Sequence, residues 1–139
     1  MEINGLKIPK ELIRLIDSGW WPTMDNVQAL VPPEKVKRIS QIDDKIYFFP
    51  PPFRIVAENV KDNPSFWESP IAATHEIDID KAIDIGDFGL GSDSPILLDY
   101  RRSNVEPSVI FLKYGETNHW HQCASTFKDF LDILEVKYT

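Results

Sequence analysis

Two histidines and the single cysteine of the chain alternate along one short segment, and their side chains are the best suited to chemistry. His119, His121 and Cys123 are separated by Trp120 and Gln122. On an extended strand every second side chain points to the same side, so the three would share one face. Imidazole nitrogen and thiolate sulfur bind zinc well, and a cysteine activated by a histidine can act as a nucleophile.

The spacing of these three side chains argues against a closed metal site. Same-face positions on one strand lie roughly 7 Å apart, whereas zinc holds its ligand atoms at about 2 to 2.3 Å. At most two of the three could bind one ion, with help from His75 or an acid. We therefore expect no metal and no cofactor, and keep a small metal-binding protein or enzyme that uses His119 and His121 as an alternative.

A second candidate is the run of carboxylates near the centre of the chain. Glu76, Asp78 and Asp80 alternate with isoleucines, so an extended backbone would put all three on one face. A calcium loop of the EF-hand type needs glycine at its sixth position and glutamate at its twelfth, and counting from Asp78 these are Ile83 and Gly89. Since no nucleophile or oxyanion donor lies nearby in the sequence, we expect a solvated polar edge.

The glycine-rich segment after the carboxylates invites a phosphate-loop interpretation. A phosphate loop needs converging backbone N–H groups at a helix N-terminus and a nearby cation. The segment from Gly86 to Gly91 contains Asp87, is followed by Asp93, and has neither lysine nor arginine. We therefore expect a hairpin turn with no nucleotide.

The second half of the chain predicts an antiparallel sheet and a final helix. Four strands are expected, over 82–86, 95–100, 108–114 and 119–124, and their short connections suit antiparallel neighbours. Thr126 and Asp129 then match a helix capping box. The apolar stripe that should dock this helix on the sheet consists of Phe127, Phe130, Leu131 and Leu134.

The first half predicts shorter elements. Pro9 and Gly19 are placed to open and close a helix. Trp20 and Trp21 follow and are expected to anchor that helix to the body of the protein. The other expected elements are a helix over 33–39, a strand over 45–49, extended backbone over 53–56 and a long loop over 62–74.

Composition and charge favour one globular domain over 1–139 with a protein partner. The chain has 139 residues and a net charge of −7, and the segment 76–99 alone contributes −6. Such a surface repels nucleic acid and anionic membranes and attracts a basic protein. The start of the chain lacks the features of a signal peptide, so a cytoplasmic protein is expected.

The order of motifs resembles the SUKH superfamily, which unites fungal regulators of cell-wall glucan synthesis with bacterial toxin-immunity proteins. The segments that carry the resemblance are IGDFGLGSD (85–93), ILLDY (96–100), VIFL (109–112) and ASTFKDFL (124–131). The resemblance implies an α/β (α+β) fold, with a mainly antiparallel mixed sheet and helices packed against it. The family has no known catalytic residues, so no enzymatic activity is expected.

These observations together predict a non-enzymatic protein-binding module. Its expected role is that of an immunity protein that neutralises a toxin domain through an acidic surface, with a cytoplasmic regulatory domain as an alternative. Steering by charge and anchoring by an aromatic residue would give the binding. The residues predicted to contact the partner are Asp78, Asp80, Asp87, Asp93 and Trp120.

Overall fold

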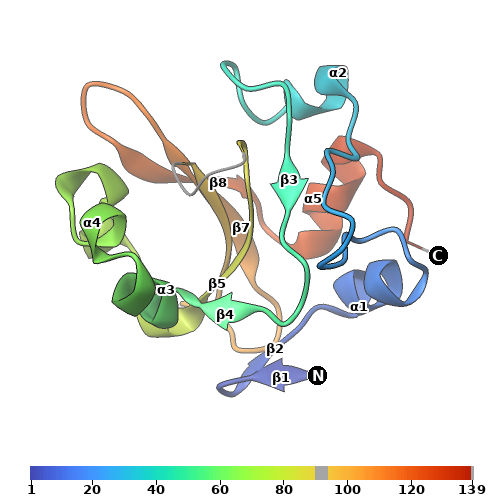
Figure 1. Cartoon of the computed structure of the whole chain (residues 1–139), viewed down its shortest axis with the longest axis horizontal. Coiled ribbons are helices and arrows are strands. Elements are labelled where there is room, and N and C mark those ends of the chain that lie inside the picture. Colours follow the sequence, from blue (N-terminus) through green and yellow to red (C-terminus); the bar gives the residue numbers. More distant parts are fainter. Residues whose placement is uncertain (90–93, 139) are drawn as a thin grey trace.

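A computed structural model describes residues 1–89 and 94–138, and its centre is a strongly twisted antiparallel sheet (Figure 1). The described residues form a six-stranded sheet in the order β3-β5-β6-β7-β8, with β4 also paired to β5, and a separate β1-β2 pair. Every pairing is antiparallel. The strands are β1 (Glu2–Ile3), β2 (Leu6–Lys7), β3 (Tyr47–Phe48), β4 (Arg54–Ile55), β5 (Ala82–Asp87), β6 (Pro95–Asp99), β7 (Ser108–Lys113) and β8 (His119–Ala124).

Helices cover both faces of the sheet, which confirms the predicted fold class (Figure 1). One face packs against α1 (Lys10–Asp17), α2 (Pro33–Val36) and α5 (Phe127–Leu134), and the other against α3 (Val56–Asp62) and α4 (Pro64–Trp67). The 3-10 turns η1 (Pro70–Ala72), η2 (Thr74–Glu76) and η3 (Ile79–Lys81) complete the second layer. Strands covered on both faces bury every side chain, so β5 and β6 are buried along their whole length.

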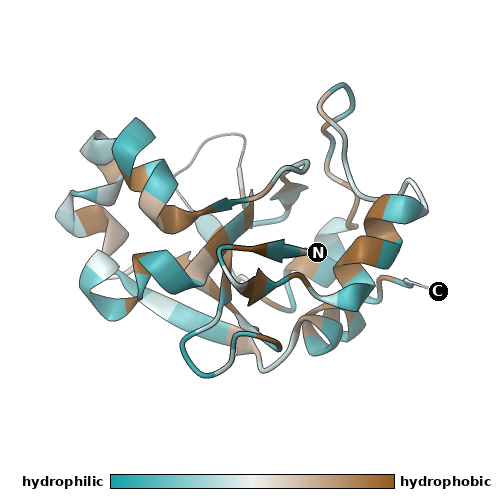
Figure 2. Ribbon diagram, turned by 90° about the horizontal axis from the view of Figure 1, so that it is seen from below, coloured by the Kyte–Doolittle hydropathy of each residue, from teal (hydrophilic) through white to brown (hydrophobic). Residues whose placement is uncertain are grey.

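The C-terminal helix α5 forms as its sequence predicts. The Asp129 amide donates a hydrogen bond of 3.0 Å to the Thr126 hydroxyl, which caps the helix. All four residues of the predicted apolar stripe are buried. Figure 2 shows the same separation of hydrophobic and hydrophilic faces on several of the helices. Trp21 also anchors α1 as expected, since its ring stacks on Phe48 with centroids 4.4 Å apart and its indole N–H bonds to the Phe49 carbonyl at 2.8 Å.

Two expectations for the middle of the chain are wrong, and one helix there was not predicted. The expected loop over 62–74 contains α4 and η1, and helix α3 follows directly on the short strand β4. Glu76 lies on η2, Asp78 caps η3 and Asp80 lies on η3, so the alternation that an extended backbone would give them is lost. Prolines at the first turns of α4 and η1 explain the error. In the sequence, a proline that begins a short helix cannot be told from a proline in a loop.

Candidate functional site

The acids of the segment 76–99 do not form one exposed face. Asp84, Asp87 and Asp99 are only 7%, 1% and 7% exposed. Asp84 and Asp87 lie on β5 and Asp99 ends β6, and both strands are enclosed by the two helical layers. The formal charge of the segment therefore overstates the charge that a partner would meet.

Asp87 is a structural residue of the β5–β6 connection, which corrects the expectation that it is exposed. Its two carboxylate oxygens accept hydrogen bonds from the Gly89 amide at 2.8 Å and the Ser94 amide at 3.2 Å. These bonds hold the backbone on both sides of the turn. Asp93, the other acid predicted in this turn, lies outside the described residues.

Asp78 and Asp80 remain accessible, at the end of the second helical layer. Asp78 is half-buried, and its carboxylate accepts a 3.0 Å hydrogen bond from the Asp80 amide, which caps η3. Asp80 is exposed. The structure thus keeps both residues at the surface, on a tight turn in place of an extended segment.

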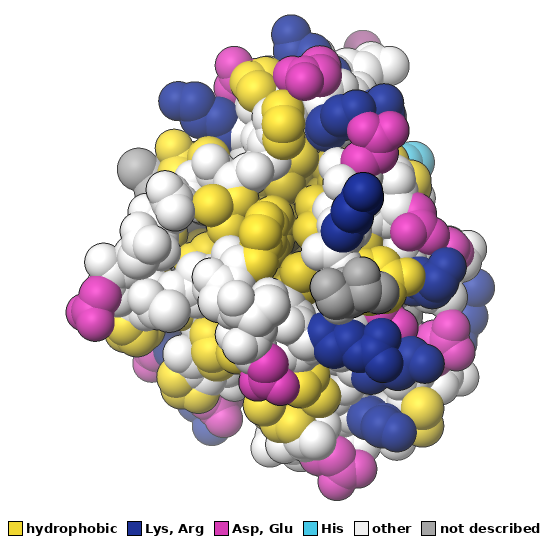
Figure 3. Space-filling model, turned by 90° about the vertical axis from the view of Figure 1, so that its right-hand side faces the viewer, with side chains coloured by type: hydrophobic (Ala, Val, Ile, Leu, Met, Phe, Trp, Pro, Cys, Tyr) yellow, Lys and Arg dark blue, Asp and Glu magenta, His cyan; other side chains and the backbone are white. Residues whose placement is uncertain are grey.

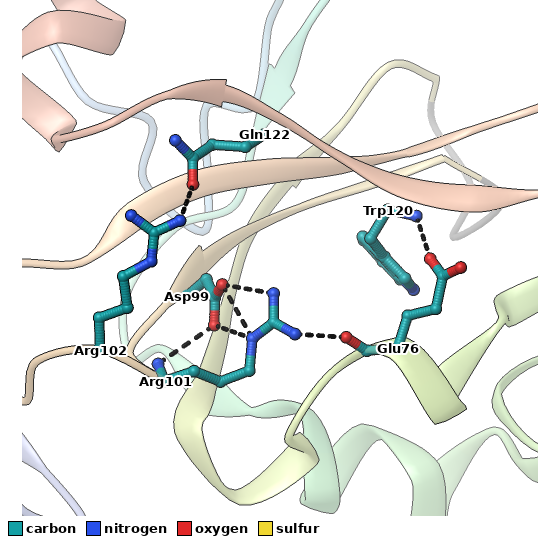
Figure 4. Close-up of polar contacts among 6 residues, drawn as sticks. All are labelled: Glu76, Asp99, Arg101, Arg102, Trp120 and Gln122. Carbon is teal, nitrogen blue, oxygen red and sulfur yellow. Dashed lines mark hydrogen bonds and ion pairs between the residues drawn. The ribbon is translucent and has the colours of Figure 1, made fainter.

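Trp120 lies on β8, the edge strand of the sheet, next to Glu76 (Figure 4). Its backbone amide donates to the Glu76 carboxylate at 2.8 Å and its indole N–H donates to the Ala72 carbonyl at 2.8 Å. The ring stacks on Trp67, with centroids 6.2 Å apart and planes within 2° of parallel. Trp120 is therefore a half-buried, rigidly held aromatic side chain.

Arg101 links the buried Asp99 carboxylate to Glu76, beside Trp120 (Figure 4). Its guanidinium donates to both oxygens of the buried Asp99 carboxylate and to the Glu76 carbonyl. The hydrogen bond to Asp99, together with the charges of Asp99, Asp78 and Glu76, raises the pKa of Arg101. We name the group formed by Trp120, Glu76, Asp78, Asp80 and Arg101 the Trp120 surface.

The histidines and the cysteine of β8 do not converge. A β-bulge shifts the β7–β8 register between Gln122 and Ala124, so Cys123 falls out of the regular alternation. His119 and His121 are exposed, and the His121 ring contacts Phe111 with centroids 5.4 Å apart.

Burial also makes Cys123 a poor ligand and nucleophile. Desolvation raises the pKa of its thiol to about 12, and the thiol contacts the Val109 carbonyl. Metal binding and nucleophilic attack both need the thiolate, which is scarce at neutral pH with such a pKa. Within residues 1–89 and 94–138, no group of three or more His, Cys, Asp or Glu side chains is arranged to hold a metal ion.

A cleft that the sequence analysis missed lies between α3 and the segment that joins β3 to β4. Its volume is about 450 Å³. Arg54, Asn59 and Asp62 contribute polar groups to its wall, and Asp84 lines it from the sheet. The apolar residues that line it are Met24, Phe49, Pro50, Pro52, Phe53 and Trp67. We name it the Asp84 cleft.

The Asp84 carboxyl is the most perturbed group in this cleft. One oxygen accepts a 2.9 Å hydrogen bond from the Asn59 side-chain amide, and the other, Oδ1, is buried without a hydrogen-bond partner among the described residues. Burial, and then the nearby charge of Asp87, raise the pKa of Asp84 well above its usual value. An aspartate between isoleucines in the AIDIG segment was the sequence signal for this site, because such a run predicts a strand buried on both faces.

Arg54 is close to Asp84 in the sheet but is bonded elsewhere. The two residues are directly paired across β4 and β5. The Arg54 guanidinium instead forms ion pairs with Glu58 and Asp62 on α3, which raise its pKa. Among the described residues, no ion pair reaches Asp84.

None of the helices in the described part of the chain combines the length and the apolar character that crossing a bilayer requires.

Comparison with known proteins finds no matching family model, no matching curated protein and no matching solved structure. The resemblance to the SUKH superfamily therefore stays a prediction from the sequence motifs.

Proposed function

We propose that this chain is a non-enzymatic protein-binding module, an immunity protein that neutralises a bacterial toxin domain by binding a basic face of it through the Trp120 surface. The observation that supports this role is the position of a half-buried indole beside accessible carboxylates at the edge of the sheet. Tryptophan is among the residues that most often dominate binding energy in protein interfaces. The motif resemblance adds the toxin-neutralising role.

The contacts of the edge strand β8 indicate whether the partner binds through backbone or side-chain groups. An edge strand offers unpaired backbone groups to which another strand can add. Here the Glu76 carboxylate already accepts the Trp120 amide, so strand addition at this position would first have to displace it. The partner is therefore bound through side chains: the indole is the anchor, and Asp78 and Asp80 are the charges around it.

The charge distribution elsewhere makes this surface distinct. Figure 3 shows the side of the molecule that carries the C-terminus, where hydrophobic side chains are exposed at the centre and acidic and basic side chains are mixed around them. On the Trp120 surface three acids stand with one arginine, whose charge is largely used by the buried Asp99, and the exposed bases Lys81 and Arg102 lie beside this surface. Attraction of a basic partner is therefore local to this edge and sensitive to salt.

An immunity protein should be encoded beside its toxin, so the test uses the toxin domain expected from the neighbouring gene, with binding kinetics measured at 50 and 300 mM salt. The double variant Asp78→Asn/Asp80→Lys changes the charge by +3 and retains an acceptor for the η3 cap. Asp17→Asn/Glu34→Lys makes the same charge change on α1 and α2, which pack on the other face of the sheet. We expect the first variant to slow association about tenfold and to flatten its salt dependence, and the second to change neither.

Trp120→Ala tests the anchor. Its loss is expected to speed dissociation by about 30-fold or more, the effect of removing a hot-spot residue worth about 2 kcal/mol. Equal effects of the two charge variants would refute steering by this surface. If the wild-type chain and the adjacent toxin domain show no binding at micromolar concentration, the immunity role is wrong.

A further inference from the structure

The Asp84 cleft contains a buried carboxyl oxygen that the described residues leave without a partner. Asp84 is 7% exposed, its Oδ2 is bonded to Asn59, and its Oδ1 has no partner at hydrogen-bond geometry among the described residues, although the Gly86 backbone N–H also favours the charged carboxyl. Native proteins pair nearly all buried polar atoms, because an unpaired one costs about 1 to 3 kcal/mol. A cost of this kind at a residue that lines a cleft points to a ligand group that pairs with the Asp84 carboxyl.

The sign of that ligand group follows from the charges around the cleft. Arg54 is the basic residue that lines the wall, and it is paired with Glu58 and Asp62 on α3. Arg54 and Asp62 line the wall and Glu58 lies just outside the lining; together the three side chains carry a charge of −1, which favours cations and disfavours anions. An ionised Asp84 would add a second negative charge deeper in the cleft.

The rest of the lining defines the body of the ligand. Phe49, Phe53 and Trp67 supply aromatic wall, and prolines and Met24 supply most of the remainder. Aromatic faces attract ammonium and guanidinium groups, more strongly where water is excluded. The volume of about 450 Å³ lies in the range of small-molecule sites, which are mostly apolar with a few polar groups that orient the ligand.

We propose that the Asp84 cleft binds a small organic cation, in which an ammonium or amidinium group on an apolar body pairs with the Asp84 carboxylate. The occupant is a small molecule, since the cleft is larger than a single lysine or arginine side chain fills. This cleft shares no lining residue with the Trp120 surface, and its ligand is distinct from the proposed protein partner.

Cation binding at this carboxyl is coupled to a proton. In the free protein, burial favours the protonated carboxyl, and a bound cation favours the carboxylate, so binding releases a proton. Affinity therefore rises with pH until the free carboxyl is itself ionised. The groups that face Asp84 are Asp87 on the same strand, Asn59 with Glu58 and Asp62 on α3, and Arg54 on β4. The charged ones among these are the same in every variant used below.

The probes are benzylammonium and benzamidinium, compared with the neutral benzyl alcohol and the anionic benzoate. Binding is followed by calorimetry and by the NMR signals of the tryptophan indoles, with the full chain at pH 6, 7 and 8. We expect the cations to bind at least tenfold more tightly than the alcohol, with no benzoate binding. Cation affinity should rise with pH, and the heat should depend on the ionisation enthalpy of the buffer, as proton release requires.

Asp84→Asn keeps the shape of the side chain and an acceptor for Asn59, and it is expected to bring the cations to the affinity of the alcohol. Asp17→Asn, which removes one exposed carboxylate on α1, should leave all affinities unchanged. Equal binding of cation and alcohol by the wild type, or no cation binding at millimolar concentration, overturns the proposal without the use of any variant. If a lysine-containing peptide competes with benzylammonium at equal concentration, the occupant is a protein side chain and the small-molecule assignment is wrong.

Discussion

Replacement of the buried Asp84 by asparagine should change how the stability of the protein depends on pH. The folded protein raises the pKa of this carboxyl well above its usual value of 3.8, mainly because of burial. The unfolded chain ionises it near that usual value. Between the two pKa values, folding therefore takes up a proton, and the contribution of Asp84 to stability is lost as the pH rises.

The size of the effect follows from the linkage between protonation and folding. A difference of one bound proton changes the free energy of unfolding by about 1.4 kcal/mol per pH unit. The asparagine side chain of the variant does not titrate, and the neighbouring Asp87, Glu58, Asp62 and Arg54 are common to both proteins. The free energy of unfolding of Asp84→Asn, relative to that of the wild type, should therefore rise by about 1.4 kcal/mol for each pH unit between the two pKa values. At pH 4 the two proteins should be of nearly equal stability.

The assay is urea unfolding followed by tryptophan fluorescence at pH 4.0, 5.0 and 6.0. The slope of the free energy of unfolding against urea concentration should be the same for both proteins, since the surface exposed on unfolding is unchanged. Asp80→Asn is the control, because Asp80 is exposed and its replacement should give a curve parallel to that of the wild type. Parallel curves for Asp84→Asn and the wild type would refute the buried, protonated state of this carboxyl.

Three further variants or reactions test other parts of the structure. Thr126→Ala removes the cap that accepts the Asp129 amide, and should lower the free energy of unfolding by about 1 kcal/mol in urea titrations. Gly86→Ala places a Cβ 2.7 Å from the Tyr47 carbonyl oxygen, so the β3–β5 pairing must shift; we expect a loss of about 1 to 3 kcal/mol, and an unchanged melting temperature would contradict this. Iodoacetamide at pH 8 should alkylate the native Cys123 thiol at least a hundredfold more slowly than the unfolded chain, because burial raises its pKa to about 12.

The parts of the fold that the sequence predicts well are those specified locally. The strands β5 to β8 are separated by turn-rich segments, and α5 has both a capping residue and a full apolar stripe. The short helices α3 and α4 were missed because elements of this length are stabilised mainly by tertiary contacts. Trp67, for example, is buried against Phe66 and Trp120, and the second of these contacts joins distant parts of the sequence.

The candidate site was harder to predict than the fold. The number of acids between Glu76 and Asp99 does not reveal which carboxylates are buried. Three of these acids are buried in the structure. The alternation of Glu76, Asp78 and Asp80 suggested one face, but the backbone there forms 3-10 turns. The Asp84 cleft depends on the approach of α3 and the proline-rich segment to β5, which no local pattern encodes.

The parallel stack of Trp67 on Trp120 joins the two regions proposed to bind ligands. Trp67 forms part of the wall of the Asp84 cleft, and Trp120 is the anchor of the surface at the sheet edge. A molecule that shifts or immobilises one ring acts directly on the other. By thermodynamic reciprocity, any change that a bound cation makes in the affinity for a protein partner must be matched by an equal change that the partner makes in the affinity for the cation. A pair of indoles would then serve as the allosteric contact of a very small protein.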